Sequence, residues 1–180
     1  MADLKISALP AATLPLTGAE LVPIVQSGTT KNVTAANLSA GFGPAFRAYS
    51  SNAQSISSAT TTKIEFNAEL FDTNNNFDST TNYRFTPTVA GYYQVNLAVG
   101  FAAMSVGEVI LQINKNGAVY QYGADVVGTT TYITSMSTLV DMNGSTDYIE
   151  GFVYQGSGLS RALATSTTQC TFSGALVRSN

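Results

Sequence analysis

Residues 82–101, with the sequence NYRFTPTVAGYYQVNLAVGF, decide the fold of this chain. Pro87 and Gly91 mark a tight corner, and beyond it the side chains alternate along the chain. One set of alternate positions holds Tyr93, Val95, Leu97, Val99 and Phe101, and the other holds Tyr92, Gln94, Asn96, Ala98 and Gly100. Successive Cβ atoms lie on opposite faces of a sheet, so this period of two predicts a half-buried strand.

From Phe46 onward the chain alternates between strand patterns and turn patterns, and no window shows a helical period. The predicted strands are Phe46–Ser50, Lys63–Phe66, Tyr83–Thr86, Tyr92–Phe101, Glu108–Asn114, Ala118–Tyr122, Tyr132–Met142, Asp147–Gln155 and Gln169–Val177. Asn116-Gly117 and Asn143-Gly144 each predict a hairpin, because both residues of a type I′ turn need positive φ. Many short strands predict an all-β sandwich, jelly roll or barrel.

Length and composition narrow the classes of partner. The 180 residues predict one domain with a short appendage, and only 11% of them are charged. The net charge is −3 and the eight Lys and Arg residues are scattered, which argues against nucleic acid and against an anionic membrane. Residues 85–107 lack charge, yet their period of two argues against membrane insertion.

The first 43 residues differ from the rest, because they are rich in proline and lack aromatic residues before Phe42. They predict an extended start and a small hairpin formed by Leu21–Gln26 and Lys31–Thr34. Such a hairpin buries too little to be stable alone, so we expect it to pack against another surface.

Few residues suit catalysis or metal binding. The chain has no histidine and one cysteine, Cys170, which excludes Ser-His-Asp triads and thiolate metal sites; we predict a buried thiol. Residues Asp72–Asp78 partly match a calcium loop, but Phe77 and Tyr83 replace the required Gly and Glu. We predict an Asn/Asp-rich turn there, with calcium as the alternative. The carboxylate pairs Glu65/Glu69 and Asp147/Glu150 do not indicate a glycosidase. We therefore expect no enzyme activity, no catalytic residue and no cofactor.

Aromatic residues are abundant, with nine Phe and nine Tyr but no Trp. Tyrosines occur at both alternating sets of strand positions, which predicts a second covered face and hence self-association. Sugar stacking on an exposed Tyr is the alternative. We expect core or axial packing for Phe46, Tyr49, Tyr93, Phe101 and Phe172.

Seven segments occur in the order found in a known family: AFRAYSS, TKIEFN, FDTNNNFD, YRFTPTVAGYYQVN, LQINKNGAVY, LVDMNGSTDYIEGFVY and FSGALV. Residues 44–177 resemble the globular head of the complement first component, a member of the tumour-necrosis-factor-like superfamily. The resemblance implies a ten-stranded jelly roll that assembles as a tight homotrimer through aromatic-rich faces. The family's collagen stalk is missing from this chain.

The N-terminal segment, with KISALP and VPIVQSGTTKNVTAANL, resembles the leading segment of tailed-phage virion proteins that precedes a fibre or knob. This resemblance implies attachment to a virion protein of capsid or tail, and we expect the hairpin's apolar residues to make it: Leu21, Val22, Ile24, Val25 and Val33. The lack of a secretory signal pattern and of disulfides fits synthesis in a bacterial cytoplasm.

Together these features predict two parts, an attachment segment over residues 1–43 and a jelly-roll knob over 44–180. The expected function is a non-enzymatic, trimeric decoration of the virion surface, of the cement or head-fibre type. The alternative is a tail-fibre tip that recognises host surface glycan through apical loops. Those loops would be 72–78, 125–131 and 156–162, with contacts from Asp72, Asn74, Asn76 and Asp78.

Overall fold

The computed structural model describes residues 19–35, 43–102, 107–123, 126–128 and 133–179, with backbone only for 126–128. The chain divides into two compact units, Met1–Phe42 and Gly43–Asn180. No helix among the described residues is both long enough and apolar enough to cross a membrane.

The described part of the first unit contains the predicted hairpin. Strands β1 (Leu21–Gln26) and β2 (Thr29–Thr34) pair antiparallel, and Val22 lies opposite Val33. Ser27 and Gly28 join them with φ of 53° and 74°, the positive values that a two-residue hairpin turn requires.

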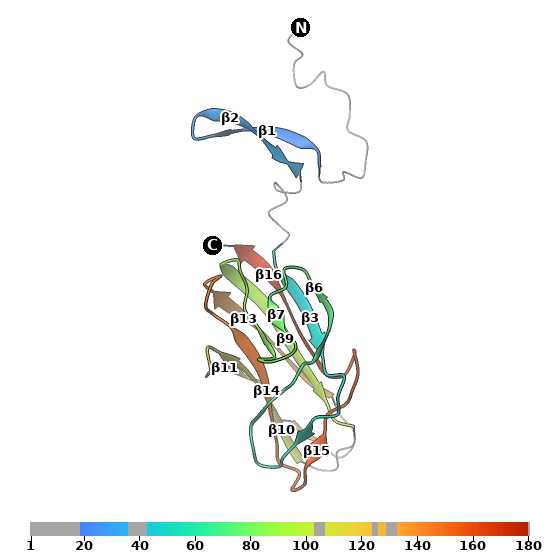
Figure 1. The fold of residues 1–180 in the computed structure, drawn as a ribbon. Helices are drawn as coiled ribbons and strands as arrows, with labels where there is room; N and C mark the ends of the chain where they lie inside the picture. Colours follow the sequence, from blue (N-terminus) through green and yellow to red (C-terminus); the bar gives the residue numbers. More distant parts are fainter. Residues whose placement is uncertain (1–18, 36–42, 103–106, 124–125, 129–132, 180) are drawn as a thin grey trace. The chain divides into compact units, whose positions relative to one another are not determined.

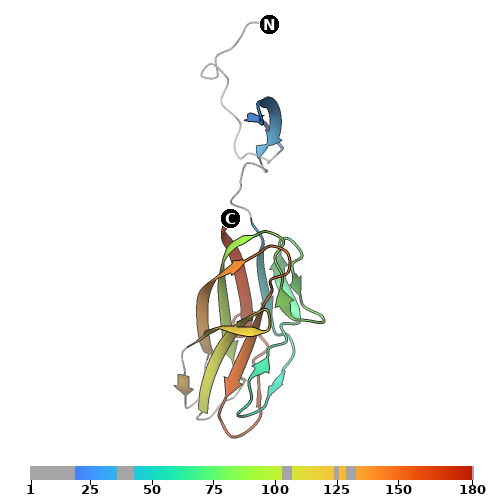
Figure 2. The ribbon, with the colours of Figure 1, turned by 90° about the vertical axis from the view of Figure 1, so that its left-hand side faces the viewer.

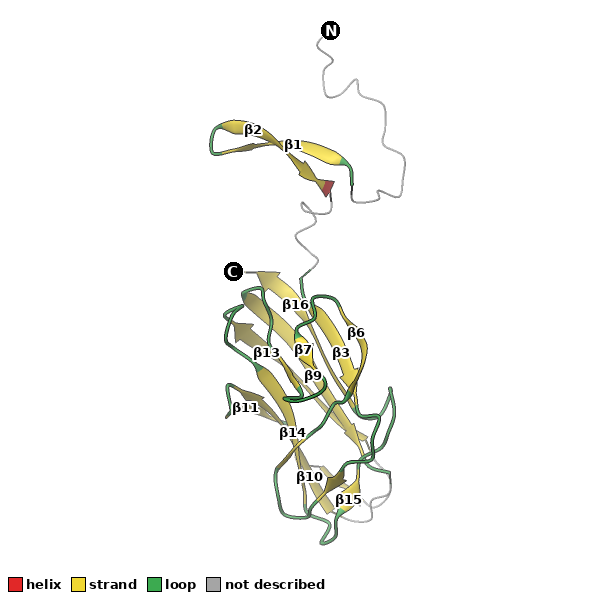
Figure 3. Ribbon diagram, in the orientation of Figure 1, coloured by secondary structure: helices red, strands yellow, loops and turns green. Residues whose placement is uncertain are grey.

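The second unit is a sandwich of two antiparallel sheets (Figures 1 and 2). The five-stranded sheet has the order β13-β9-β16-β3-β6, and the seven-stranded sheet follows the path β11-β10-β14-β8-β7, with β12 beside β10 and β5 beside β14. Strands β15 and β4 form a separate pair. Figure 3 shows strands joined by loops throughout the described part of this unit. The strands are β3 (Ala45–Tyr49), β4 (Ser55–Ile56), β5 (Thr62–Lys63), β6 (Ala68–Asp72), β7 (Phe77–Asp78), β8 (Arg84–Phe85), β9 (Gly91–Gly100), β10 (Gly107–Lys115), β11 (Ala118–Tyr122), β12 (Val126–Gly128), β13 (Ile133–Met142), β14 (Ile149–Gln155), β15 (Arg161–Ala162) and β16 (Thr171–Ser179).

Strand β9 confirms the predicted alternation. It lies between β13 and β16, and its Tyr93, Val95, Leu97 and Val99 are completely buried between the two sheets. On the other side of the strand, Tyr92, Gln94, Asn96 and Ala98 are exposed or half-buried. The predicted strand is therefore the centre of one sheet and supplies one wall of the core.

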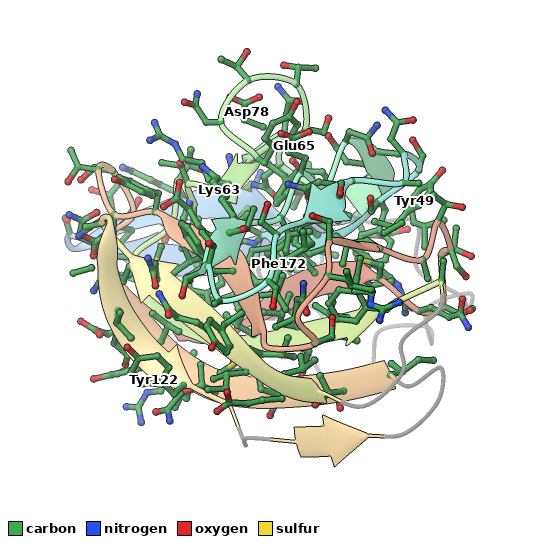
Figure 4. All side chains as sticks on the ribbon, turned by 90° about the horizontal axis from the view of Figure 1, so that it is seen from below. Tyr49, Lys63, Glu65, Asp78, Tyr122 and Phe172 are labelled. Atoms are coloured by element: carbon green, nitrogen blue, oxygen red, sulfur yellow. The ribbon has the colours of Figure 1, made fainter. Side chains whose placement is uncertain are left out.

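Phenylalanines fill the interior. The Phe46 ring stacks on Phe85 at 4.2 Å between centroids and meets Phe172 edge-on at 5.2 Å, while Phe66 stacks on Phe172 at 5.5 Å. Figure 4 shows Phe172 inside the sandwich. Six of the nine phenylalanines are buried, namely Phe46, Phe66, Phe77, Phe85, Phe101 and Phe172. Most of the phenylalanine surplus is thus explained by the core of a single chain.

The two Asn-Gly pairs have different roles. Asn116 and Gly117, with φ of 53° and 80°, close the predicted hairpin between β10 and β11. The predicted hairpin at Asn143-Gly144 is wrong, because β13 belongs to the five-stranded sheet and β14 to the seven-stranded sheet. The Asn143 Oδ1 atom accepts hydrogen bonds from the backbone N–H groups of residues 145–147, all at 3.0 Å. These bonds stabilise a wider loop that carries the chain from one sheet to the other.

Strand β6 was not predicted. Its burial does not alternate: the three central residues are all exposed, because the strand lies at the edge of the sheet and its pairing with β3 shifts register between Arg47 and Ala48. The predicted strand over 63–66 is shorter than expected, since β5 covers Thr62–Lys63 only, although Ile64 and Phe66 are buried.

Candidate functional site

The side of the five-stranded sheet that faces away from the core, called the outer face below, is a broad surface with small side chains at its centre. The register places Ser137, Asn96 and Ser173 in one row across β13, β9 and β16, and Ser135 and Ala98 in the next. Small residues on a sheet allow another surface to approach its backbone closely. This part of the outer face is therefore shaped for contact.

Large apolar side chains border that centre. Tyr92, Phe71, Leu139 and Ile133 project from β9, β6 and β13, and each is 42–49% exposed. Exposed apolar residues that gather on one face of a soluble protein commonly mark a contact surface. Neither the border nor the centre contains a group suited to catalysis.

The outer face is hollowed next to Arg47. A depression of about 220 Å³ is lined by Arg47, Phe71, Gln94 and Ser173 among others. Arg47 donates from Nη2 to the Thr167 carbonyl oxygen at 3.1 Å, whereas its buried Nε has no hydrogen-bond partner within the described chain. A buried N–H without an acceptor is costly, so this atom reduces the stability of the folded chain.

The structure places the five predicted packing residues in two environments. Phe46, Tyr93, Phe101 and Phe172 are at most 1% exposed and lie inside the sandwich, where the Tyr93 hydroxyl donates to the Val89 carbonyl at 2.7 Å. They pack the core of one chain and do not reach the outer face. Tyr49, on β3, is half-buried and pairs in register with Thr171 on β16.

The residues predicted for attachment lie on the β1–β2 hairpin. Leu21 and Val25 are 64% and 74% exposed, and they alternate with the half-buried Val22 and Ile24. Val33 is half-buried opposite Val22. The hairpin therefore presents exposed apolar side chains at alternate positions of β1.

The Asp72–Asp78 segment forms hydrogen-bonded turns. Asp72 accepts from the Phe77 N–H at 2.6 Å and from the Asn74 N–H at 3.3 Å, while the Asn76 Oδ1 accepts from the Thr88 N–H at 3.2 Å. Asp78 accepts from three backbone N–H groups, and these bonds, that of Thr81 first, hold the pKa of its carboxyl well below the usual range. The Asn/Asp turn prediction is confirmed, and no group of three or more potential metal ligands occurs in the described residues.

The predicted grouping of three apical loops is wrong. The Thr73 N–H donates to the Ala45 carbonyl at 3.0 Å, so Asp72 and Asn74 lie at the end where the sandwich begins. Residues 156–162 follow β14 at the opposite end, and most of 125–131 lies outside the described residues (Figure 1). Strands β6 and β14 run in opposite directions, so the loops that follow them emerge at different ends of the sandwich.

Three ion pairs and one buried thiol are part of the folded structure. Lys63 pairs with the buried Glu150, and Lys115 lies 3.0 Å from Asp147 and 3.3 Å from Asp141. Cys170 is buried, which confirms the predicted buried thiol, and burial raises the pKa of this thiol to about 12.

Comparison with known proteins shows the fold. No protein-family model and no curated protein sequence matches this chain. The globular domain of zebrafish complement 1qA protein is similar in structure, with a TM-score of 0.54 and 17% identity over 77% of this chain and 99% of that one. Murine APRIL gives 0.53 and 10% identity over 74% of this chain and 98% of its own. The chain thus has the jelly-roll fold shared by complement 1q and tumour-necrosis-factor-like proteins, as predicted.

Sequence reasoning missed most of the outer face. The alternation in the sequence of Ile133–Met142 could have revealed part of this face, because it places Ile133, Ser135, Ser137 and Leu139 on one side of the strand. Phe71 was not detectable in this way, because it lies in the irregular edge strand β6.

Proposed function

We propose that the protein is a non-enzymatic structural knob in which three copies bury their outer faces against one another. The observation that carries this proposal is the outer face itself, with small side chains at its centre and exposed Tyr92, Phe71, Leu139 and Ile133 at its border. The resemblance of the sequence to a family of trimeric jelly rolls supports the number three.

The chemistry of the outer face suits a permanent contact between copies. Obligate interfaces are more apolar than ordinary surfaces and bury on the order of 2,000 Å² or more.

The proposed location is the surface of a phage particle, where the N-terminal segment attaches the knob to a capsid or tail protein. The resemblance of residues 1–43 to leading segments of virion proteins supports this role. So do the exposed Leu21 and Val25, which provide apolar contact area on the hairpin. We favour a knob on the head, and a receptor-binding tail-fibre tip is the second candidate.

Attachment is testable with fluorescently labelled full-length protein and intact particles. We expect labelled protein to decorate particle heads, and Val25→Asp to abolish that binding. Thr29→Asp is the matched control, because Thr29 is exposed on the same hairpin but lies opposite Gln26, on the other face from Val25. Label confined to tail tips would favour the tail-fibre alternative, and equal binding by both variants would contradict attachment through the hairpin.

A further inference from the structure

A second hollow lies on the other sheet, away from the outer face defined above. It occupies about 510 Å³ on the exposed side of β10, β11 and β14, and its lining includes Thr61, Glu108, Ile110, Gln112, Tyr122 and Tyr154. This volume lies within the range of small-molecule sites. The proposed trimer leaves this side of the sandwich open to solvent.

Two tyrosines and an aliphatic residue form the apolar part of the hollow. Tyr154 lies opposite Ile110 across β14 and β10, and Tyr122 lies opposite Gln112 across β11 and β10. Tyr122 is 58% exposed, and Figure 4 shows it at the periphery of the sandwich. A large aromatic side chain left in solvent beside a hollow provides a platform on which a flat apolar surface packs.

The polar part has unused hydrogen-bonding capacity. Gln112 is only 8% exposed, and its Nε2 donates to Asn114 Oδ1 at 2.6 Å, while its Oε1 accepts no bond from a described residue. The side chains of Thr61, Glu108, Tyr122 and Tyr154 likewise make no hydrogen bond to any described residue. Asp78 differs from these side chains, because its carboxylate already accepts hydrogen bonds from the backbone of its own loop.

We propose that this hollow binds a neutral saccharide. A pyranose has a C–H face that packs on an aromatic ring and hydroxyl groups that both donate and accept. The tyrosines supply the ring, and the amide, carboxylate and hydroxyls of Gln112, Glu108 and Thr61 supply both kinds of polar partner. None of the described side chains in the lining is cationic, so the site does not favour anionic sugars or phosphates.

This inference goes beyond the proposed structural role and does not depend on it. The hollow belongs to a single chain, so saccharide binding is measurable on the isolated protein whether or not particles are decorated. It also differs from glycan recognition by loops, since the strands β10, β11 and β14 carry most of the lining.

Saturation-transfer NMR on the full-length protein tests the proposal, with the methyl glycosides of glucose, galactose, mannose and N-acetylglucosamine as probes. We expect at least one of them to bind with millimolar affinity, which corresponds to about −4 kcal/mol. Tyr122→Ala should weaken that binding about ten-fold. Tyr83→Ala, which removes a half-buried tyrosine that belongs neither to the lining of the hollow nor to the outer face, should leave the affinity unchanged.

Tetramethylammonium serves as the competing probe, because two tyrosines and a carboxylate also suit a cation. Glu108→Gln keeps hydrogen-bonding capacity and removes the charge, so it should retain saccharide binding within a few-fold. Three results would overturn the proposal: no binding of any glycoside, binding that is insensitive to Tyr122→Ala, or binding of tetramethylammonium alone with loss in Glu108→Gln.

Discussion

The two faces of strand β9 differ in what covers them. Leu97 points into the sandwich and is completely buried by the chain itself, whereas its neighbour Ala98 points to the outer face and is only half-buried. Both faces of the sheet carry apolar side chains, and the sandwich covers only one of them. One chain therefore buries the inner face by itself, and we propose that other copies bury the outer face. Substitutions on the two faces should therefore have different consequences.

The largest effect is expected inside. Leu97→Ala leaves a cavity against Phe66 and Gly151 and should lower the free energy of unfolding by about 2–5 kcal/mol. Chemical denaturation monitored by circular dichroism measures this loss. Leu159→Ala, which truncates a 64% exposed leucine, is the control and should change stability little. Equal losses in both variants would contradict the assignment of β9 to the core.

The second-largest effect is expected for a substitution that leaves each chain folded but separates the copies of the trimer. Ala98→Arg places a charge on the outer face, where a partner copy would bury it without a counterion. We expect the trimer to dissociate about 100-fold more readily, with unchanged circular dichroism. Ala53→Arg adds the same charge at an exposed alanine in a loop and should have no effect on assembly. An Ala98→Arg variant that assembles like the original protein would show that the outer face is free.

A smaller effect is expected in the loop that joins the two sheets. Asn143→Ala removes an acceptor shared by the N–H groups of Ser145, Thr146 and Asp147, and should cost about 1–2 kcal/mol. Thermal unfolding measures the cost, and Asn52→Ala, in an exposed loop, is the comparison. The variant should remain trimeric, because the loop lies outside the outer face. An unchanged melting temperature would contradict the role assigned to the Asn143 side chain.

The smallest effect depends on pH. The pKa of Asp78 is lowered in the folded chain, so its contribution to stability is present above its unfolded pKa of about 3.9 and is lost as pH falls through the folded value. The original protein should be more stable than Asp78→Ala above about pH 5. Below about pH 4 this advantage should shrink, and it should stay under about 1 kcal/mol because solvent screens the group. An advantage that grows on acidification would have the wrong sign.

Local patterns were sufficient to predict most of the sandwich but not its edges. Alternation in 92–101 and 133–142 identifies strands with one buried side, and Asn116-Gly117 identifies a hairpin, because each signal depends only on neighbouring residues. The Asn143-Gly144 pair led to a wrong hairpin prediction, because the same dipeptide also occurs in a loop between two sheets. Strand β6, which contains Phe71, was not predicted, because an edge strand with shifted register has no clear period in its sequence.

Local sequence patterns were likewise not sufficient to predict the outer face and the hollow. The sequence identified aromatic residues suited to packing, yet it could not separate Tyr93 in the core from Tyr122 beside a hollow, since that depends on which strands meet. The hollow combines Thr61, Gln112 and Tyr154 from three distant parts of the chain. The attachment role of the hairpin and the phage location stay predictions.

Sedimentation equilibrium of the full-length protein at micromolar concentration tests the central claim most directly. If three copies cover one another's outer faces, the mass should be three times the 18.9 kDa of the chain. Hydroxyl-radical footprinting of the same sample should then find Tyr92 and Leu139 protected. A single 18.9 kDa species with both side chains open to solvent would contradict the account.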